Sequence, residues 1–296
     1  MSKILLIGGS NIDYIGTSKS PLIMKTSNIG SLKISYGGVM RNVVENLARL
    51  NNDCYFITAI GEDLYGNKLK NFLKNELNVK LFFPITNLPT SSYICINDSN
   101  HDMAIALNDM EIMRDLSPRF LDANKSIINE FNDIILDSNI SEESLEYLFK
   151  NFPNKRFYCE GISAEKVIKF KPYLGNIFLL KCNLYEAKAL FNEENDIQKL
   201  LIAIKNSGVK NCVITQGEND IYYFDNKEIS KVSVEKIKKI NGNTTGCGDA
   251  MFAGIIDKLL KNESLKKSII FGEKLSVLTL QSSEAVNKNV SKLIDD

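Results

Sequence analysis

Apolar and polar residues follow two alternating patterns along this chain. Short runs rich in Ile, Leu, Val and Phe, typical of buried strands, are separated by longer runs with helical spacing. The pattern predicts strands at 3–7, 54–60, 133–136, 156–159, 177–181, 212–215 and 221–224. It predicts helices at 40–50, 64–77, 142–148, 164–169, 184–191, 197–206, 250–260 and 266–281. Such an alternation indicates an α/β fold in which a mostly parallel sheet is covered on both faces.

Two stretches depart from this alternation. Residues 14–36 and 81–107 hold β-branched and aromatic runs with turn residues, and neither shows a helical pattern. We interpret both as strands of a small antiparallel β sheet, inserted into a single domain that spans residues 1–296. A sheet inserted in this way is expected to act as a lid over a site at the edge of the main sheet.

Charge and cysteine content narrow the class of protein. The 296 residues include 36 basic and 36 acidic side chains, so no imbalance of charge indicates a nucleic-acid or membrane partner. The apolar run near the N-terminus is too short for a signal peptide, and no run approaches a membrane span. Six scattered cysteines, with no Cys-x-x-Cys pair and a single histidine, argue against a zinc site and are typical of reduced core residues. We therefore expect a cytoplasmic enzyme.

The segment Asn-Thr-Thr-Gly-Cys-Gly-Asp at 243–249 leads into a predicted helix. Gly246 and Gly248 flank Cys247, so the backbone can turn its N–H groups toward one point, where the positive end of the helix dipole also attracts an anion. Asp249 would repel a bound anion. It suits a base that takes a proton from a hydroxyl group while the loop stabilises a phosphoryl group. The alternative is a capped helix in which Asp249 serves only the dipole, and the dipole should lower the pKa of Asp249 in either case.

Polar residues also follow the first predicted strand. Asn11 and Asp13 stand at alternate positions, so both side chains can face the same way, and an amide with a carboxylate suits the vicinal hydroxyls of a sugar. The alternative is an Asx turn that closes the strand. Four residues around the start of the next helix, where glycines allow a ligand to approach the backbone closely, complete this group: Gly37, Gly38, Arg41 and Asn42.

The carboxyl ends of two later strands carry polar residues as well. Asn183 and Glu186 are three residues apart and share a helical face, so Glu186 could orient hydrated Mg²⁺. The same spacing fits a capping box with Asn183 as the N-cap residue. After the next strand, Thr215, Gly217 and Glu218 form a turn that suits nucleotide phosphate or ribose, and that equally fits an ordinary turn.

In this order, the motifs resemble those of the ribokinase-like (PfkB) family of sugar and nucleoside kinases. The likeness covers essentially the whole chain and rests on four signals in register: Gly37-Gly38 before a helix, Asn183-x-x-Glu186, Thr215-x-Gly217-Glu218 and Gly246-x-Gly248-Asp249. It implies a three-layer α/β sandwich with a β lid, and phosphoryl transfer from ATP with Asp249 as the base. The anion hole is then formed by Gly246, Cys247 and Gly248, and Glu186 holds Mg²⁺ through water. The implied nucleotide contacts are Asn183, Thr215, Gly217, Glu218 and Thr245.

Within this family, the chain is most similar to the pseudouridine kinases. The segments that carry this likeness include Arg41-Asn42, Ser92-Tyr93 and Asn108-Asp109-Met110. The likeness implies that the phosphoryl group is transferred to the 5′-hydroxyl of pseudouridine, and that Arg41 contacts the base or a phosphate. The residues implied to bind the nucleoside are Asn11, Asp13, Gly37, Gly38, Arg41, Asn42, Ser92 and Asp109.

The family resemblance has three further implications. Lids of this family often pair between subunits, which implies a homodimer. Asn243 stands where many members carry an aspartate linked to a monovalent cation, which argues against activation by potassium. The alternatives are another sugar or nucleoside kinase of the family, or a non-catalytic binding protein, which would have no need of the Asp249 base.

Overall fold

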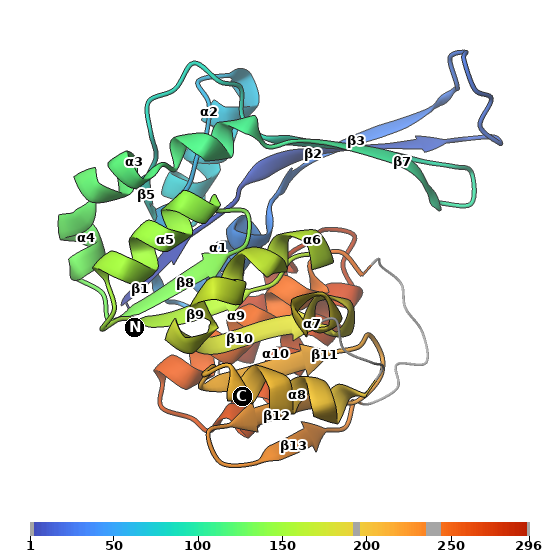
Figure 1. The fold of residues 1–296 in the computed structure, drawn as a ribbon. Coiled ribbons are helices and arrows are strands. Elements are labelled where there is room, and N and C mark those ends of the chain that lie inside the picture. The colour runs from blue at the N-terminus through green and yellow to red at the C-terminus, as the bar shows by residue number, and fades with distance from the viewer. Residues whose placement is uncertain (1–2, 192–195, 235–243, 295–296) are drawn as a thin grey trace.

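The computed structural model describes residues 3–191, 196–234 and 244–294. Its centre is a nine-stranded sheet in the order β13-β12-β11-β10-β9-β8-β1-β4-β5 (Figure 1). Every pair from β11 to β5 is parallel, whereas β12 and β13 extend one edge as antiparallel strands. The strands are β1 (Lys3–Ile7), β4 (Asp53–Ile57), β5 (Lys80–Phe82), β8 (Asp133–Asp137), β9 (Arg156–Glu160), β10 (Ile177–Asn183), β11 (Asn211–Thr215), β12 (Ile221–Asp225) and β13 (Ile229–Val232).

Helices cover both faces of this sheet, as the sequence pattern predicts. Alternate side chains of β1 point to opposite faces, so Leu5 and Ile7 join one core cluster while Ile4 and Leu6 join the other. The first cluster packs under α3 (Pro118–Ala123), α4 (Lys125–Asn129), α5 (Glu142–Asn151), α6 (Ala164–Val167), α7 (Leu184–Phe191) and α8 (Ile197–Asn206). The second packs under α1 (Val39–Arg49), α2 (Leu64–Asn71), α9 (Cys247–Leu260) and α10 (Leu265–Leu280).

Most helices begin where the sequence provides a capping side chain. Serine side chains accept hydrogen bonds from backbone N–H groups in the first turns of α5, α6 and α10. These serines are Ser141, Ser163 and Ser264. Four irregular helical segments complete the layers: the π-helical turn η1 (Phe72–Glu76) and the 3₁₀ segments η2 (Glu111–Asp115), η3 (Ile168–Asn176) and η4 (Lys288–Leu293). No helix in the described part of the chain combines the length and the apolar character needed to cross a bilayer.

Several element boundaries differ from the prediction. The helix expected at 64–77 continues beyond Asn71 as a π-helical turn, and the strand expected at 54–60 ends at Ile57. Neither β5, β13 nor the pair α3 and α4 was predicted. These elements have between three and six residues, so each is too short to display a strand or helix period.

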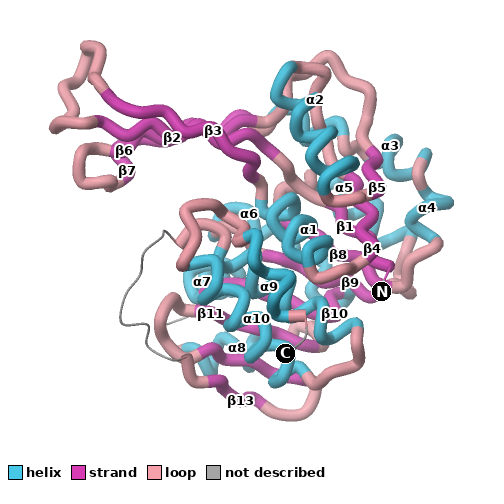
Figure 2. The backbone as a smooth tube through the Cα atoms, turned by 180° about the vertical axis from the view of Figure 1, so that it is seen from behind, coloured by secondary structure: helices cyan, strands magenta, loops and turns pink. Residues whose placement is uncertain are grey.

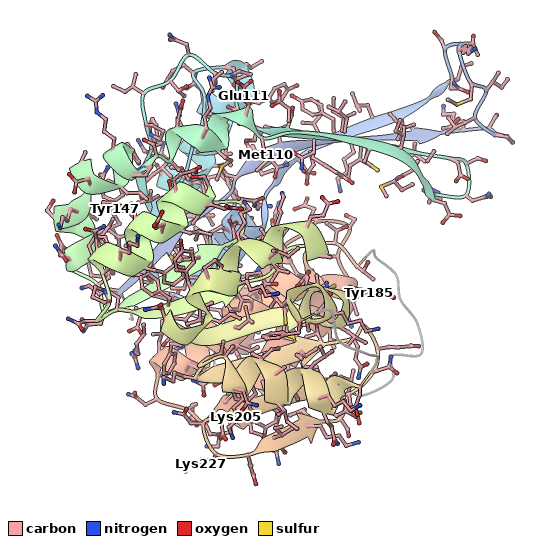
Figure 3. All side chains as sticks on the ribbon, viewed as in Figure 1. Met110, Glu111, Tyr147, Tyr185, Lys205 and Lys227 are labelled. Atoms are coloured by element: carbon pink, nitrogen blue, oxygen red, sulfur yellow. The ribbon has the colours of Figure 1, made fainter. Side chains whose placement is uncertain are left out.

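The second sheet projects from the body as the expected lid (Figures 1 and 2). It has the order β3-β2-β6-β7, formed by β2 (Asn11–Ser18), β3 (Gly30–Gly37), β6 (Ser92–Asn97) and β7 (Met103–Asp109). Its outer pairs are antiparallel, whereas the two central strands β2 and β6 run parallel. Residues 81 and 82 were expected in this sheet but belong to β5 of the main sheet. In Figure 3, Met110 and Glu111 mark the place where the chain returns from β7 to the body.

The parallel topology brings the predicted motifs to one edge. Strands β1, β8, β9, β10 and β11 are neighbours in the sheet, and they all point the same way. Their carboxyl ends therefore form a continuous row, which is where α/β sheets bind ligands. The lid strand β2 starts just after β1, so the lid begins at this same edge.

Candidate active site

The residues that follow β1 form one side of the site. The Asn11 side-chain amide donates to Asp13 Oδ1, so both side chains face the same way, as predicted. A Cβ atom on Gly37 would overlap the Asp13 carboxylate, and this glycine is therefore what lets the carboxylate lie against β3. Gly38 has a φ of 97°, and a Cβ there would lie 2.6 Å from Ser10 Cα. Only glycine combines this conformation with this close approach.

A buried carboxylate that the sequence analysis did not assign holds this region together. Asp137, at the end of β8, accepts hydrogen bonds from Gly9 N at 2.9 Å, Met40 N at 3.2 Å and Asn139 N at 2.9 Å. It joins the loop after β1 to the first turn of α1. The signals in the sequence were its position at the end of an apolar strand and the likeness of Asp137-Ser138-Asn139 to the pseudouridine kinases.

A hydrogen bond from Asn42 connects Asp249 to the side of the site that follows β1. The Asp249 carboxylate lies in the first turn of α9 and is 9 % exposed, and Asn42 Nδ2 on α1 donates to its Oδ2 atom at 2.6 Å. Burial raises the pKa of Asp249 to about 6, against the opposing effects of Asn42, Lys181 and Arg41. The expected lowering by the helix dipole was wrong, because desolvation of the carboxylate outweighs it.

Arg41 is bonded mainly to neighbouring groups of the protein. It is 2 % exposed, and its guanidinium donates to Tyr36 O at 2.5 Å, to Gly37 O at 3.2 Å, to Glu45 Oε2 at 2.5 Å and to Asn42 Oδ1. The structure therefore places Arg41 behind Asn42, where its guanidinium makes four hydrogen bonds to the protein. The predicted contact of Arg41 with a base or a phosphate stays a prediction.

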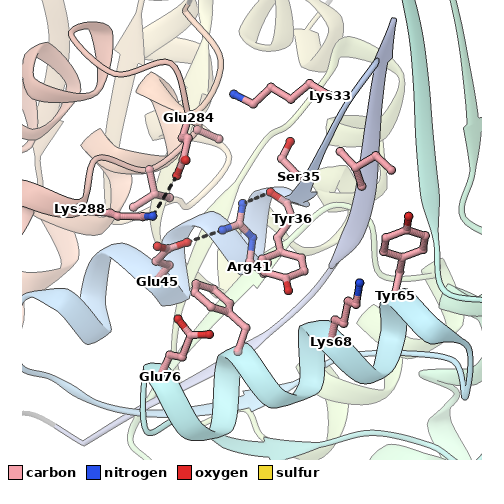
Figure 4. A pocket seen from close by; sticks show the side chains of 14 residues that line it. Lys33, Ser35, Tyr36, Arg41, Glu45, Tyr65, Lys68, Glu76, Glu284 and Lys288 are labelled. Carbon is pink, nitrogen blue, oxygen red and sulfur yellow. Dashed lines mark hydrogen bonds and ion pairs between the residues drawn. The ribbon is translucent and has the colours of Figure 1, made fainter. Parts of the chain in front are cut away.

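A cavity of about 510 Å³ lies on the outer side of Arg41 (Figure 4). Its wall is formed by the edge strand β3, by α1, α2 and η1, and by the segment that leads into η4. The labelled lining residues include Lys33, Tyr36, Arg41, Glu45 and Lys288. Asp249 and Asn42 do not line it. This cavity is therefore separate from the place where the predicted base lies.

The glycine loop before α9 turns at Gly246, as expected, but one of its three predicted donors is bonded within the turn. Gly246 is left-handed, with a φ of 81°, and a Cβ there would overlap the carbonyl oxygen of Ala285. The N–H group of Cys247 donates to Thr244 O at 3.3 Å, which leaves Gly246 and Gly248 as the better placed donors to a ligand. Thr245 is exposed in the same turn. Asn243, on which the potassium expectation rests, lies outside the described residues.

Lys181 is a site residue that the sequence analysis missed. A Cβ on Gly248 would lie 3.0 Å from Lys181 Nζ, so the ammonium group lies directly beneath the glycine loop. Lys181 donates to Glu160 Oε1 at 2.6 Å, and both side chains are 5 % exposed. Burial alone would lower the pKa of Lys181, but the carboxylate of Glu160 raises it, so the lysine stays charged. A lysine inside a buried strand was the available signal.

Asn183 and Glu186 form the capping box. Glu186 N donates to Asn183 Oδ1 at 2.9 Å, while the Glu186 carboxylate accepts from Asn183 N at 2.9 Å and from Asn183 Nδ2 at 2.6 Å. A Cβ on Gly161 would lie 2.5 Å from Glu186 Oε2, so this carboxylate is next to the end of β9. The capping interpretation is therefore realised. The predicted role of Glu186 toward a cation stays a prediction.

The carboxylates near Lys181 suit a hydrated Mg²⁺ ion. Glu160 Oε2 is buried and has no hydrogen-bond partner among the described residues. Within the same residues, no group of three or more His, Cys, Asp or Glu side chains could enclose a metal ion. Mg²⁺ is commonly held by one or two carboxylates together with water and phosphate oxygens. An orphaned carboxylate oxygen next to Glu186 fits that kind of site.

The predicted nucleotide residues lie further along the same edge. Thr215 pairs with Asn183 at the ends of β11 and β10. Gly217 has a φ of 64°, and a Cβ there would meet nothing within 4 Å, so the turn borders open space. Glu218 is exposed in this turn. The structure therefore brings Thr215 beside the capping box, and it leaves Gly217 and Glu218 on the open rim.

The lid residues divide between two faces. Asp13, Ser35, Tyr93 and Asn108 are paired in register across the four strands and share one face. Ser92 and Asp109 belong to the next row, which faces the opposite way because side chains alternate along a strand. The structure thus does not bring Ser92 and Asp109 together with Asp13, and it puts their sequence neighbours Tyr93 and Asn108 there instead.

Comparisons with known proteins agree with this arrangement. The pfkB family carbohydrate kinase profile matches residues 1–292. The chain is 32 % identical to the pseudouridine kinase of Escherichia coli strain K12, over 97 % of this chain and 93 % of that protein. It is 24 % identical to the guanosine-inosine kinase of Exiguobacterium acetylicum, over 100 % of this chain and 99 % of that protein.

A solved structure shares the fold. The ribokinase of Thermotoga maritima superposes with a TM-score of 0.87 at 19 % identity, and the match covers 99 % of both chains. The family profile and the relative of 32 % identity both span nearly the whole sequence. This chain therefore belongs to the pfkB family of carbohydrate kinases.

Proposed function

We propose that this chain is an ATP-dependent kinase that phosphorylates the 5′-hydroxyl of pseudouridine to give pseudouridine 5′-phosphate. The observation that carries the proposal is the hydrogen bond from Asn42 to Asp249. It places a buried carboxylate between the sugar-binding side of the site and the glycine loop before α9. The relative with pseudouridine kinase activity, at 32 % identity over nearly the full length, supports the choice of acceptor.

The mechanism follows from the position of Asp249. Its carboxylate accepts the proton of the 5′-hydroxyl as the hydroxyl oxygen bonds to the γ-phosphorus of ATP, and the bond from that phosphorus to the β–γ bridging oxygen breaks to release ADP. A pKa of about 6 keeps Asp249 ionised at neutral pH and makes it a stronger base than an exposed aspartate. The N–H groups of Gly246 and Gly248 and the charge of Lys181 stabilise the transferring phosphoryl group.

The acceptor is held by the residues between β1 and α1. Asn11 and Asp13 bind the ribose hydroxyls, Gly37 and Gly38 allow the sugar to approach the backbone, and Asn42 lies next to the reacting hydroxyl. On the lid, Tyr93 and Asn108 are the side chains that share the Asp13 face, and they cover the base in place of Ser92 and Asp109. Closure of this lid excludes water, which competes as a phosphoryl acceptor.

ATP and Mg²⁺ are assigned to the carboxyl ends of β9 to β11. Glu160 and Glu186 would hold the hydrated cation, and Asn183, Thr215, Thr245, Gly217 and Glu218 would border the nucleotide. Mg²⁺ would supply neutralisation of phosphate charge during transfer. Lys181 and the start of α9 supply the protein's own positive potential at the same place.

The alternative function is phosphorylation of another nucleoside or a sugar by the same site. The guanosine-inosine kinase at 24 % identity supports a nucleoside as the acceptor, although with a different base. A non-catalytic binding role is disfavoured by the buried Asp249 in the first turn of α9, because a binding protein has no need of a base there. We further propose a cytoplasmic homodimer that pairs through the lid.

A substrate panel tests the proposed function. The purified chain is incubated with ATP, Mg²⁺ and one acceptor from a set of pseudouridine, uridine, guanosine, inosine, adenosine, ribose and fructose, and ADP release is measured. We expect the highest kcat/KM with pseudouridine, and we expect Asp249→Asn to lower kcat by at least about 10²-fold. A preference for another acceptor overturns the choice of pseudouridine. Near-normal turnover of Asp249→Asn overturns the role of the base.

A further inference from the structure

Arg41 is the most highly connected cation near the site, and the proposed mechanism does not use it. Its guanidinium is buried between α1 and the end of β3, where it contacts two backbone carbonyls, Glu45 and the side-chain oxygen of Asn42. Figure 4 shows the bonds to Glu45 and to the Tyr36 carbonyl from the cavity side. Asn42 lies beyond Arg41 and contacts Asp249.

We propose that Arg41 is a positioning residue, which fixes the side-chain amide of Asn42 so that Nδ2 faces the Asp249 carboxylate. The proposal rests on the proposed function, because it concerns the base of that reaction. A side-chain amide has two orientations of similar shape, one with the NH₂ group and one with the oxygen toward Asp249. A guanidinium has donors only, so it can donate to the amide oxygen but cannot bind the NH₂ group. Arg41 thereby selects the orientation that donates to Asp249.

The amide bond also orients the carboxylate. Asn42 occupies Asp249 Oδ2, so Oδ1 is the oxygen that is left to take the hydroxyl proton. The flipped amide would instead place an oxygen against a carboxylate in a site that is less than 10 % exposed, and the two groups would repel each other. Positional errors of about 1 Å at a reacting group can cost about 10²-fold in rate. The expected effect of losing Arg41 is therefore a loss of turnover rather than of acceptor binding.

Arg41 is itself held by a partner that also anchors a second arginine. Glu45 accepts from Arg41 Nη1 at 2.5 Å through Oε2 and from Arg49 Nη2 at 2.6 Å through Oε1. Arg49 lies one helical turn beyond Glu45 on α1. It forms no hydrogen bond with Asn42 among those of the described residues. It is therefore a matched control, because its removal breaks the same kind of ion pair without touching the amide.

A double-mutant cycle tests the proposal. We expect Arg41→Met to lower kcat about 10- to 100-fold with less than a threefold change in the KM for the acceptor, and Arg49→Met to change neither by more than about twofold. In an Asn42→Ala background, Arg41→Met should have less than a threefold effect, because the amide through which it acts is gone. A full effect in that background overturns the proposal. So does a rise in KM at constant kcat, which would mean that Arg41 binds the acceptor.

A second measurement needs no substrate, so it separates this proposal from the proposed function. The carboxyl ¹³C resonance of Asp249 is titrated in the free protein, where the charged groups facing it are Arg41, Lys181, Asp137 and Glu160. Of these groups, only Arg41 is lost in Arg41→Met, so the midpoint of the Asp249 titration should rise in that variant. Arg49→Met removes none of them, so its midpoint should stay at the wild-type value. An unchanged midpoint in Arg41→Met overturns the proposal. A wild-type chain that transfers phosphate to no acceptor overturns the proposed function alone.

Arg41→Lys covers the case in which Arg41→Met does not fold. Lysine keeps the charge opposite Glu45 but presents a single ammonium group, which cannot reach Glu45, the Tyr36 carbonyl and Asn42 together. We expect it to show the same loss of kcat as Arg41→Met, with thermal unfolding close to that of the wild type. Full activity in Arg41→Lys overturns the proposal, because it would show that charge alone suffices.

Discussion

At the residue scale, the site consists of buried charges whose partners are all inside the protein. Asp249 accepts a hydrogen bond from Asn42, Lys181 pairs with Glu160, and Arg41 pairs with Glu45. Asp137 accepts from three backbone N–H groups. Buried charges are costly unless they are paired in this way. Such a network holds each group in one orientation before substrate arrives. This pre-organisation is what electrostatic stabilisation of a transition state requires.

The pH dependence of the reaction should report Asp249. Because burial raises the pKa of Asp249 to about 6, the base is protonated and inactive below that pH. We expect kcat/KM for the acceptor to rise with pH to a plateau above about pH 7, with a midpoint near 6. Initial rates in buffers of constant ionic strength measure this. A profile that stays flat down to about pH 5 would show that a different group, or none, takes the proton.

The same carboxylate should lower the stability of the fold at neutral pH. The pKa of Asp249 is about 6 in the folded chain, against an ordinary value of 3.8, so its contribution favours folding while the group is protonated and is lost as the pH rises between these values. We expect Asp249→Asn to raise the free energy of unfolding at neutral pH by about 1–3 kcal/mol.

Urea unfolding of the wild type and of Asp249→Asn, at about pH 5 and about pH 7.5, measures the difference in their free energies of unfolding. This difference should be larger at the higher pH. An equal difference at both pH values would mean that the substitution acts through packing or hydrogen bonding, and not through the buried charge.

Sequence reasoning found the residues of the site more readily than their orientations. Asn42 and Asp249 were identified from glycine-flanked helix starts, and the structure joins them. The prediction that Arg41 contacts a ligand stays a prediction, and the structure adds bonds from its guanidinium to two carbonyl groups, which a sequence does not show. Ser92 and Asp109 were each one residue away from the face that carries Asp13, and a shift of one residue in a strand exchanges the faces.

At the element scale, the start of α9 depends on its left-handed glycine. Gly246 is the N-cap of the helix and packs against the backbone of Ala285, while Lys33 of the lid strand β3 donates to Ser283 O at 2.6 Å. The segment 283–285 therefore touches both the anion loop and the lid. The helix itself was predicted from its period and its glycines. This tertiary support has no local sequence signal, because it comes from residues nearly 40 positions away.

Gly246→Ala should disrupt this loop. The new Cβ would overlap the Ala285 carbonyl and would also strain a backbone with a φ of 81°. We expect kcat to fall by about 10²–10³-fold, the cost of losing an oxyanion-type donor, with a smaller change in the KM for the acceptor. Steady-state kinetics with ATP and pseudouridine measure this effect.

Gly217→Ala is the stability control for this variant. Gly217 also has a positive φ, of 64°, but a Cβ there meets nothing within 4 Å. Gly217→Ala should therefore lower the free energy of unfolding by only about 1 kcal/mol from backbone strain, and Gly246→Ala should lower it by more. Equal losses in the two variants would show that the Ala285 contact does not constrain the loop.

At the scale of the whole molecule, the lid has one polar face and one apolar face. The polar face carries Asp13 and points toward the site. On the other face, rows of paired residues run across all four strands, and five apolar side chains there are between 39 % and 65 % exposed: Leu32, Ile34, Ile94, Ile105 and Leu107. The base of this face is covered by α2, through the Tyr14–Tyr65 ring contact. A continuous exposed apolar surface of this kind marks an interaction site.

Pairing of two lids through this face would bury it, and the proposed homodimer can be tested there. We expect the wild-type chain to sediment as a dimer at micromolar concentration and the double variant Ile105→Lys, Leu107→Lys to sediment as a monomer, because each lysine would have to be desolvated between two sheets. Ala106→Lys adds the same type of charge to the same strand but on the site face, so it should leave the dimer intact. A monomeric wild type, or a dimer that survives the double substitution, would show that the apolar face does not pair with a second copy. A dimer present in the wild type but lost in both variants would instead point to the strand itself, since β7 is an edge strand whose backbone could pair as readily as its side chains.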